Sequence, residues 1–410
     1  MSFIADFHIH SKYSRATSKD MDMQSLVKWA KIKGVSMLGT GDFTHPVWFS
    51  ELEKTLEETG YGVYAYEGVY FVLTTEVSNI YFKLGRTRKV HNIIFAPSLK
   101  AAEEINSLLS EYGNLSADGR PILGLECDKM VRMLSGINPD VFFVPSHAWT
   151  PHFSIFGSNS GFDSPEECFG SETAKIFSIE TGLSSDPKMN WRWSKLDRFC
   201  LTSNSDAHSP AKIGREANVF KEKIDYHQLI NILRTKDKNK FLYTIEFFPE
   251  EGKYHWDGHR MCKTRLSPKE AIDVNNACPV CGKRITIGVM HRVEALADRG
   301  EGYVDILSPS FKSVVPLAEI IGDALGVSSD SVKVEREYFQ LIKNFGNEFN
   351  ILLEVSEKEL KTKCSQTIAK SIINMRKGNI DIVPGYDGEY GKVSVFKGDE
   401  KESDKQLSFF

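Results

Sequence analysis

The sequence predicts an α/β protein in three parts: a barrel of parallel strands and alternating helices, a small zinc-binding module, and a mainly helical C-terminal region. Apolar, strand-like runs alternate with helical patterns along the first part, which is typical of a parallel barrel. Three cysteines then fall within twenty residues, and helical spacing returns after residue 317. With 410 residues the chain is long enough for two or three domains. We expect the boundaries at residues 1–247, 248–300 and 301–410.

The composition excludes several classes of protein. A hydrophobic content of 41%, with 11% aromatic residues, supports a packed core and excludes wholesale disorder. The net charge of −4 means that any nucleic acid would be bound through a local basic patch. Four of the seven cysteines stand alone and three cluster, which indicates a reducing compartment and one metal site. There is no signal-peptide pattern and no apolar run of about 18 residues, so we expect a soluble cytoplasmic protein without a membrane span.

The first predicted strand carries two histidines. His8 and His10 follow the apolar run Phe3-Ile4-Ala5. Alternation along a strand sends residues i and i+2 to the same face, so the two imidazoles would point together from the strand end. Two imidazoles directed at one point suit a metal ion.

The same arrangement recurs along the chain. A helix is expected between the N-cap pair Thr17-Ser18 and Gly34, followed by a strand that leads to Asp42. Further strands are expected over residues 68–76, 92–95, 140–147, 175–180 and 199–206, and helices over 48–60, 99–112, 126–134, 317–345 and 355–375. A basic loop is expected over 83–89, a long functional loop over 148–170, and a loose tail after Val393.

Eight metal-binding side chains fall at or beside the ends of these strands: His8, His10, Asp42, Glu76, His91, His147, Asp206 and His208. Each alone has an ordinary explanation, such as a strand cap or a satisfied core histidine. As a set they lie where α/β barrels place their chemistry. A carboxylate such as Glu76 can bridge two divalent ions that hold a phosphoryl oxygen and activate water, which predicts phosphoester hydrolysis. Zinc, manganese, iron and magnesium all remain candidates, in two to three ions.

A second metal site is predicted in the middle of the chain. His259, Cys262, Cys278 and Cys281 have the spacing of a closed, tetrahedral structural zinc site. His255 is a rival fourth ligand with a poorer fit to that spacing. Residues 259–299 carry eight Lys and Arg against four Asp and Glu, a net charge of +4. This excess indicates either a phosphate-facing surface or an ordinary solvated one.

The motifs resemble those of the polymerase and histidinol phosphatase (PHP) metal-dependent phosphoesterases. They are Asp-Phe-His-Ile-His at residue 6, Gly41-Asp42, Thr75-Glu76, His91, Ser146-His147 and Asn-Ser-Asp-Ala-His at residue 204. The resemblance implies a distorted (β/α)7 barrel with up to three metals. A PHP barrel followed by a zinc module and a helical tail is similar to the endonuclease Q family, and this similarity covers nearly the whole chain. It implies cleavage of DNA 5′ of deaminated bases (uracil, hypoxanthine, xanthine) and of abasic sites.

The resemblance also implies roles for the ligands. His8, His10, Glu76 and Asp206 would surround one ion and act as the catalytic residues, and Glu76 would bridge to a second ion held by His91 and His147. Asp42 and His208 would hold a third. Many PHP members have histidine directly after the Asp42 position, where this chain has Phe43, so the third ion is the least supported. Glu180 would orient a ligand histidine or serve as a polar strand cap.

An extruded damaged nucleotide requires a stacking, hydrogen-bonding pocket. The predicted loop over 148–170 supplies Trp149, His152, Phe153 and Phe156 next to the ligand His147, and Arg86 and Arg88 precede the ligand His91. We expect the former to form the pocket and the latter to bind phosphate. The alternatives are that the aromatic residues pack the barrel rim and that the arginines lie in a solvated loop.

Two other functions remain in view. A PHP-type small-molecule phosphatase is compatible with the barrel, although a small phosphate ester does not require a zinc module. The second alternative is a non-catalytic adaptor that binds nucleic acid and whose metals are structural. The expected partner is DNA with deaminated bases or abasic sites, no membrane is involved, other repair proteins are candidate partners, and a monomer is expected.

Overall fold

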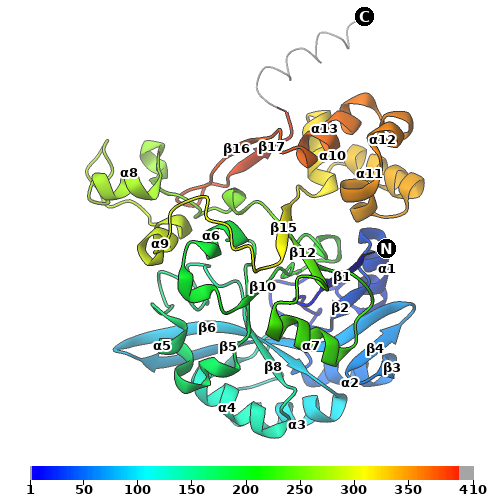
Figure 1. Cartoon of the computed structure of the whole chain (residues 1–410), viewed down its shortest axis with the longest axis vertical. Helices are drawn as coiled ribbons and strands as arrows, with labels where there is room; N and C mark the ends of the chain where they lie inside the picture. The colour runs from blue at the N-terminus through cyan, green and yellow to red at the C-terminus, as the bar shows by residue number, and fades with distance from the viewer. Residues whose placement is uncertain (1, 397–410) are drawn as a thin grey trace, which may run out of the picture.

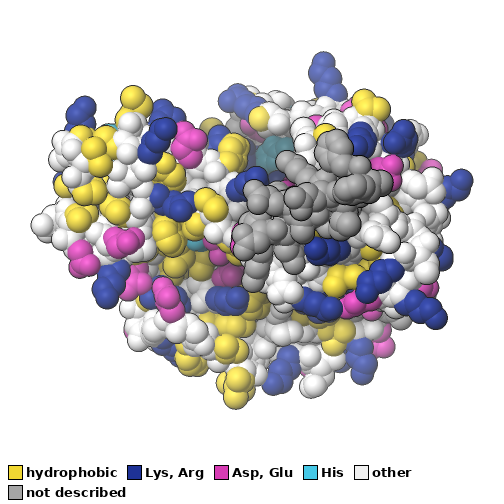
Figure 2. All heavy atoms as spheres, turned by 90° about the horizontal axis from the view of Figure 1, so that it is seen from above, with side chains coloured by type: hydrophobic (Ala, Val, Ile, Leu, Met, Phe, Trp, Pro, Cys, Tyr) yellow, Lys and Arg dark blue, Asp and Glu magenta, His cyan; other side chains and the backbone are white. Residues whose placement is uncertain are grey.

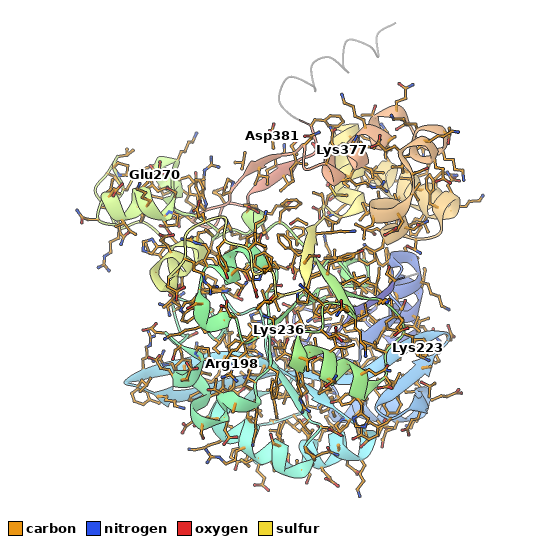
Figure 3. All side chains as sticks on the ribbon, in the orientation of Figure 1. Arg198, Lys223, Lys236, Glu270, Lys377 and Asp381 are labelled. Carbon is orange, nitrogen blue, oxygen red and sulfur yellow. The ribbon has the colours of Figure 1, made fainter. Side chains whose placement is uncertain are left out.

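The structure is a computed structural model that describes residues 2–396. A large α/β lobe forms the lower part of the molecule in Figure 1, and two smaller units lie above it. The module for which we predicted a zinc site, marked by Glu270 in Figure 3, is at one side, and the C-terminal helices, near Lys377, are at the other. No helix of the described residues is long and apolar enough to cross a membrane. Residues 397–410 of the tail that we expected to be loose lie outside the described residues.

The central sheet begins as predicted and then becomes mixed. Strands β1 (Phe3–Asp6), β2 (Met37–Gly39) and β5 (Val69–Lys83) are parallel neighbours. Next, β5 forms a long antiparallel hairpin with β6 (Arg86–Ala96), and β8 (Phe142–Pro145) pairs antiparallel with β6. Strands β9 (Ser178–Glu180) and β10 (Cys200–Thr202) form a separate parallel pair. The α/β class is therefore confirmed, with a sheet that is not purely parallel.

The prediction of a loop over residues 83–89 is wrong. Lys83 pairs with Arg86, so only Leu84 and Gly85 separate the strands. Both have positive φ, 52° and 76°, as a two-residue hairpin turn requires. The basic residues that suggested a solvated loop lie in the hairpin.

The chain after β10 returns to the end of β1. The Phe7 backbone N–H donates to Asn204 Oδ1 (2.9 Å), and Ile9 forms a bridge with Ala207. The buried Asp6 carboxylate accepts hydrogen bonds from the backbone N–H groups of Ser205 (3.0 Å) and Gly214 (2.9 Å). These contacts place the residues that follow β1 and β10 side by side.

Other strands extend the sheet at both edges. Beyond β1 lie β11 (Ala217–Phe220), β12 (Phe241–Glu246) and β15 (Ser310–Ser313). Beyond β5 lie β4 (Val63–Tyr66) and β3 (Glu57–Gly60), and the two-residue β7 (Ile122–Leu123) also pairs with β5. The helix expected over 48–60 ends earlier, because α2 spans Pro46–Thr55 and β3 follows it.

The helices of this lobe mostly begin at capping residues. Asp22 caps α1 (Met23–Lys33), Ser98 caps α3 (Leu99–Leu109), and Asp225 forms a capping box at α7 (Tyr226–Thr235). The remaining helices are α4 (Cys127–Ile137), α5 (Pro165–Phe169) and α6 (Pro187–Trp191).

The upper units are tied to the lobe below. The module contains β13 (Asp257–His259), β14 (Thr264–Leu266), α8 (Pro268–Asp273) and α9 (Val289–Leu296). The helical region contains α10 (Leu317–Leu325), α11 (Val332–Phe345), α12 (Glu357–Lys363) and α13 (Gln366–Arg376), and β16 (Asp381–Val383) pairs with β17 (Lys392–Ser394). Lys33 on α1 forms an ion pair with Glu348 (2.5 Å), which joins the first helix to this region.

Candidate metal centre

Four predicted ligands meet where the residues that follow β1 and β10 lie beside the middle of β5. One donor atom from each of His8, His10, Glu76 and Asp206 lies within 4.8 Å of the others. His10 Nε2 is 3.1 Å from Asp206 Oδ1 and 3.5 Å from Glu76 Oε2, and His8 Nε2 is 3.5 Å from Glu76 Oε1. Ligands at about 2.0–2.2 Å from an ion lie roughly 3–3.5 Å apart, so this spacing suits one ion.

A second group shares Glu76 with the first. Glu76 Oε1 lies 3.0 Å from His91 Nδ1 and 3.1 Å from His147 Nε2, and those two nitrogens are 3.3 Å apart. The side chain of Glu76 is fully buried. Its carboxylate thus stands between two sets of donors, as an ion-bridging ligand does.

Three ligand histidines are held by their other ring nitrogen. His8 Nδ1 donates to Glu180 Oε2 (2.9 Å), and His10 Nδ1 donates to Asp42 Oδ1 (3.0 Å). His147 Nδ1 lies 2.8 Å from Thr150 Oγ1. Such outer partners fix the tautomer and the ring orientation of a metal-binding histidine. Glu180 is thus placed as an orienting residue, the first of the two roles considered for it.

Asp42 is placed differently from the prediction. Gly41 has φ +61°, and a Cβ there would lie 2.3 Å from the Ile9 carbonyl oxygen, so glycine allows Asp42 to approach His10 closely. One Asp42 oxygen accepts from His10, and the other accepts from the Ser11 backbone N–H (2.6 Å) and the Ser14 hydroxyl (2.9 Å). A carboxylate with both oxygens engaged in this way acts as a partner of His10.

His208 lies beside the centre but outside both groups. Its ring packs on His10 at 4.5 Å, and its Nδ1 is 2.8 Å from the Asp206 carbonyl oxygen. Among residues 2–396, no group of close metal-binding atoms contains Asp42 or His208. The expected third ion therefore has no assembled ligand set within this part of the chain.

The site has a strained backbone and strong internal electrostatics. Asp42, His147 and Asp206 have φ values of 48°, 30° and 47°, in the left-handed region that few residues other than glycine adopt, although aspartate and histidine do so more often than most. Burial tends to raise the pKa of the Glu76 carboxyl, but His91 and His8 outweigh it and hold this pKa well below its usual range. Burial lowers the pKa of His91 to about 4, which keeps this imidazole neutral, as metal ligation requires.

One buried atom fits the predicted metal particularly well. His8 Nε2 faces the Glu76 and Asp206 carboxylates, is buried, and has no hydrogen-bond partner among the described residues. A buried nitrogen without a partner is costly, and an ion among these donors would satisfy it. The residues of both groups therefore fit divalent metal.

Arg120 joins the centre although no sequence pattern pointed to it. Its Nη1 lies 3.2 Å from Glu76 Oε2, and its side chain is 24% exposed. It comes from the segment before β7, where one arginine among 51 basic residues carries no recognisable signal. Arg120 places a positive charge at the carboxylate shared by the two groups.

The predicted substrate residues divide into two sets. Trp149 and Phe156 are buried, pack against Trp193, and cannot stack on an extruded base; this part of the prediction is wrong because they form core. Arg88 is also buried and donates to the Lys83 carbonyl oxygen (3.1 Å).

Phe153 is half-buried beside the centre, and its neighbour His152 is exposed. The centroid of the Phe153 ring lies 4.8 Å from that of the His91 ring, and His152 Nε2 lies 3.0 Å from Asn159 Nδ2. Arg86 is exposed at the start of β6, although its Nη2 donates to the Gly161 carbonyl oxygen (3.0 Å).

The four predicted zinc ligands also come together. Donor atoms of His259, Cys262, Cys278 and Cys281 lie within 4.8 Å of one another. Burial tends to raise the pKa of the Cys278 thiol, but hydrogen bonds from the backbone N–H groups of Cys281 and Val280 outweigh it and bring the pKa to about 6. His255, the rival ligand, is buried outside this group. The arrangement suits zinc, whose identity stays a prediction.

Two of the arginines that give residues 259–299 their net positive charge face the lower lobe. Arg292 donates to the Phe156 carbonyl oxygen (2.9 Å) and forms an ion pair with Asp163 (2.5 Å). Arg299 forms an ion pair with Asp197 (2.5 Å). Part of the excess charge therefore fastens the module to the lobe.

Known proteins resemble this chain over most of its length. The crystal structure of the lesion-specific endonuclease PfuEndoQ from Pyrococcus furiosus superposes with a TM-score of 0.86 at 30% identity, covering 98% of this chain and 99% of that one. The chain belongs to the endonuclease Q family. The expectation that it is a nuclease is thereby confirmed.

Further relatives agree with this assignment. A structure of endonuclease Q with a 27-mer duplex that has an abasic lesion at the active site matches with a TM-score of 0.85 at 31% identity, covering 97% of this chain and 98% of that one. Bacillus subtilis YqxK is 29% identical over 408 residues, 95% of this chain and 98% of YqxK. Methanocaldococcus jannaschii MJ0043 is 35% identical over 255 residues, 60% of this chain and 31% of MJ0043. The family model of the MJ0043 C-terminal domain matches residues 316–379 of this endonuclease Q family member.

Proposed function

We propose that this chain is a DNA-repair endonuclease that hydrolyses the phosphodiester 5′ of deaminated bases (uracil, hypoxanthine, xanthine) and of abasic sites with divalent metals. The observation that carries the proposal is the buried Glu76 carboxylate shared by two sets of metal-binding side chains. An endonuclease Q with an abasic duplex at its active site, 31% identical to this chain, supports the substrate class.

The residues of the centre have distinct tasks. His8, His10, Glu76 and Asp206 would hold one ion, and His91 and His147 would hold another with Glu76. Divalent ions bound there would polarise a phosphoryl oxygen and activate a water molecule at neutral pH. The Arg120 guanidinium lies beside the Glu76 carboxylate, and it would neutralise a phosphate oxygen in the transition state.

Recognition of the lesion would use the surface beside His91. His152 and Phe153 lie at this edge, and a donor N–H there would accept the carbonyl of a deaminated base and oppose the amino group of adenine or cytosine. Lys and Arg side chains are spread over both upper units among acidic ones (Figure 2), so the flanking duplex would meet single basic side chains there.

The finer features of the fold belong to the same proposal. The lower lobe would be a distorted (β/α)7 barrel, the module would hold one structural zinc, and the protein would act in the cytoplasm as a monomer.

The test uses end-labelled duplexes with a single uracil, hypoxanthine or abasic site, and an undamaged duplex as the control. We expect a nick 5′ of each lesion that requires divalent metal, is abolished by a chelator, and is absent with Asp206→Asn. Turnover of a simple phosphate monoester without cleavage of any duplex would instead identify a small-molecule phosphatase.

A further inference from the structure

The β5–β6 hairpin continues well beyond the metal centre. Glu76 lies midway along β5, and His91 on β6 pairs with Ser78. Because side chains alternate along a strand, Ile80 and Phe82 share the face of the hairpin that carries Glu76. Phe82 is six residues from Glu76, about 20 Å at roughly 3.3 Å per residue.

This face carries exposed apolar side chains. Phe82 is 71% exposed, Leu84 at the turn 62%, and Ile122, which pairs with Ser78 from β7, 56%. We call these three residues the hairpin patch. Ile122 marks the end of the patch nearer the metal centre, because it pairs with Ser78, two residues from Glu76 along β5.

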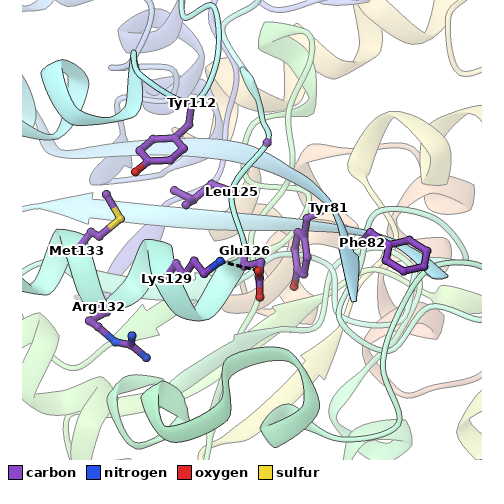
Figure 4. Close-up of a pocket in the computed structure, with 9 residues that line it drawn as sticks. Tyr81, Phe82, Tyr112, Leu125, Glu126, Lys129, Arg132 and Met133 are labelled. Atoms are coloured by element: carbon purple, nitrogen blue, oxygen red, sulfur yellow. Dashed lines mark hydrogen bonds and ion pairs between the residues drawn. The ribbon is translucent and has the colours of Figure 1, made fainter. Parts of the chain in front are cut away.

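The opposite face of the hairpin packs normally. Tyr81 is buried next to Cys168 and, with Phe82, Leu125 and Met133, lines a pocket of about 540 Å³ beside α4. Figure 4 shows the Phe82 ring beyond Tyr81, directed away from α4. Phe82 borders that pocket but is 71% exposed, so packing within the described residues leaves most of its apolar surface uncovered.

The turn itself carries an unfavourable residue. Leu84 has φ +52° at the first position of the two-residue turn, where asparagine followed by glycine is strongly preferred. A bulky residue in this conformation is strained, and the Leu84 side chain is mostly exposed. Folding alone would favour asparagine over leucine at this position, so the leucine adds an exposed apolar side chain at a cost to the turn.

We propose that the hairpin patch binds the duplex that flanks the lesion, about six base pairs from the cleaved bond. This inference rests on the proposed function. At 3.4 Å per base pair along a strand, 20 Å corresponds to about six base pairs. Apolar side chains contact sugars or enter base steps of bent DNA, and Lys89, whose Nζ lies 5.2 Å from the Phe153 ring, supplies charge between the patch and the centre.

A protein partner fits the patch less well. A stable protein interface buries about 800 Å² on each side, and three side chains at a hairpin tip cover only a fraction of that. The continuity of the patch with the metal centre also favours the substrate as its occupant.

The experiment compares wild type with Leu84→Asn and Phe82→Ala, and with Val332→Ala, which alters an 80% exposed valine on α11, as the control. Single-turnover cleavage of an abasic duplex gives the protein concentration for half-maximal rate. One duplex has ten base pairs on each side of the lesion, and two others have one arm shortened to three.

We expect Leu84→Asn to raise the melting temperature by about 1–3 °C, because it relieves the turn. We expect Leu84→Asn and Phe82→Ala to raise the half-maximal concentration about five- to tenfold on the long duplex. This difference should vanish for one of the two shortened duplexes, and Val332→Ala should behave as wild type on all three.

The inference would be overturned if both variants had the same half-maximal concentration as wild type on the long duplex while Leu84→Asn is folded and more stable. A fall in molecular mass of the variants by sedimentation would also overturn it, since the patch would then join copies of the chain. If wild type cleaves no lesion duplex at all, the proposed function fails and the patch is not the cause.

Discussion

Glu180→Gln tests how the centre is held together. Both oxygens of the buried Glu180 lie near His8 Nδ1, at 2.9 and 3.1 Å, and among the described residues no other side chain bonds this nitrogen. A glutamine offers one acceptor and no charge, so the His8 imidazole becomes less basic and less fixed. Loss of such an outer partner typically weakens metal binding 10- to 100-fold, about 1.4–2.7 kcal/mol.

The assay is a calorimetric titration of metal-free protein with Mn²⁺. We expect Glu180→Gln to weaken the ion between His8 and Asp206 by this factor and to affect the ion at His91 and His147 less. Glu246→Gln is the matched control, because Glu246 is equally buried but bonds to Thr181 and Thr244 instead of a ligand histidine. Unchanged affinity in folded Glu180→Gln would refute the orienting role.

Three further predictions concern other parts of the protein. Arg120→Ala removes a cation 3.2 Å from Glu76. Calorimetry should therefore show that the free protein binds metal several-fold more tightly, while cleavage of lesion DNA becomes slower. An unchanged metal affinity would contradict this prediction. Cys278→Ser should remove one zinc per chain by elemental analysis and expose the module to proteolysis, whereas retention of zinc would disprove the ligand set. Burial raises the pKa of Glu246 from 4.5 to about 8; between these values the unfolded chain loses this proton and the folded chain keeps it, so stability falls as pH rises. Glu246→Gln should therefore gain on the order of 1–3 kcal/mol of unfolding free energy relative to wild type at pH 8 and little at pH 4.5, and an equal difference at both pH values would contradict the assignment.

Local patterns predicted the ligands well where short sequence spacing alone brings the side chains together. His8 and His10 are separated by one residue directly after β1, and the Cys278–Cys281 pair has a fixed metal-binding spacing, so neither needed knowledge of distant contacts. The same logic failed for Asp42: whether a carboxylate faces an ion or the outer nitrogen of His10 depends on the approach of β2 to β1, which Gly41 permits.

Burial was the main property that the sequence did not reveal. Trp149 and Arg88 looked like a base platform and a phosphate ligand, yet both lie inside, where Trp149 donates to Asn190 Oδ1 (2.8 Å). Aromatic and basic residues near a ligand histidine have the same sequence signature in a core and in a pocket. Arg120 shows the converse, since tertiary structure alone brings it to Glu76.

The most direct test of the shared carboxylate is an anomalous-scattering map of crystals grown with Mn²⁺, recorded above the manganese edge. We expect two peaks about 3.5–4 Å apart on either side of Glu76, one near His8, His10 and Asp206 and one near His91 and His147. A single peak, or two peaks that do not share Glu76, would contradict the account.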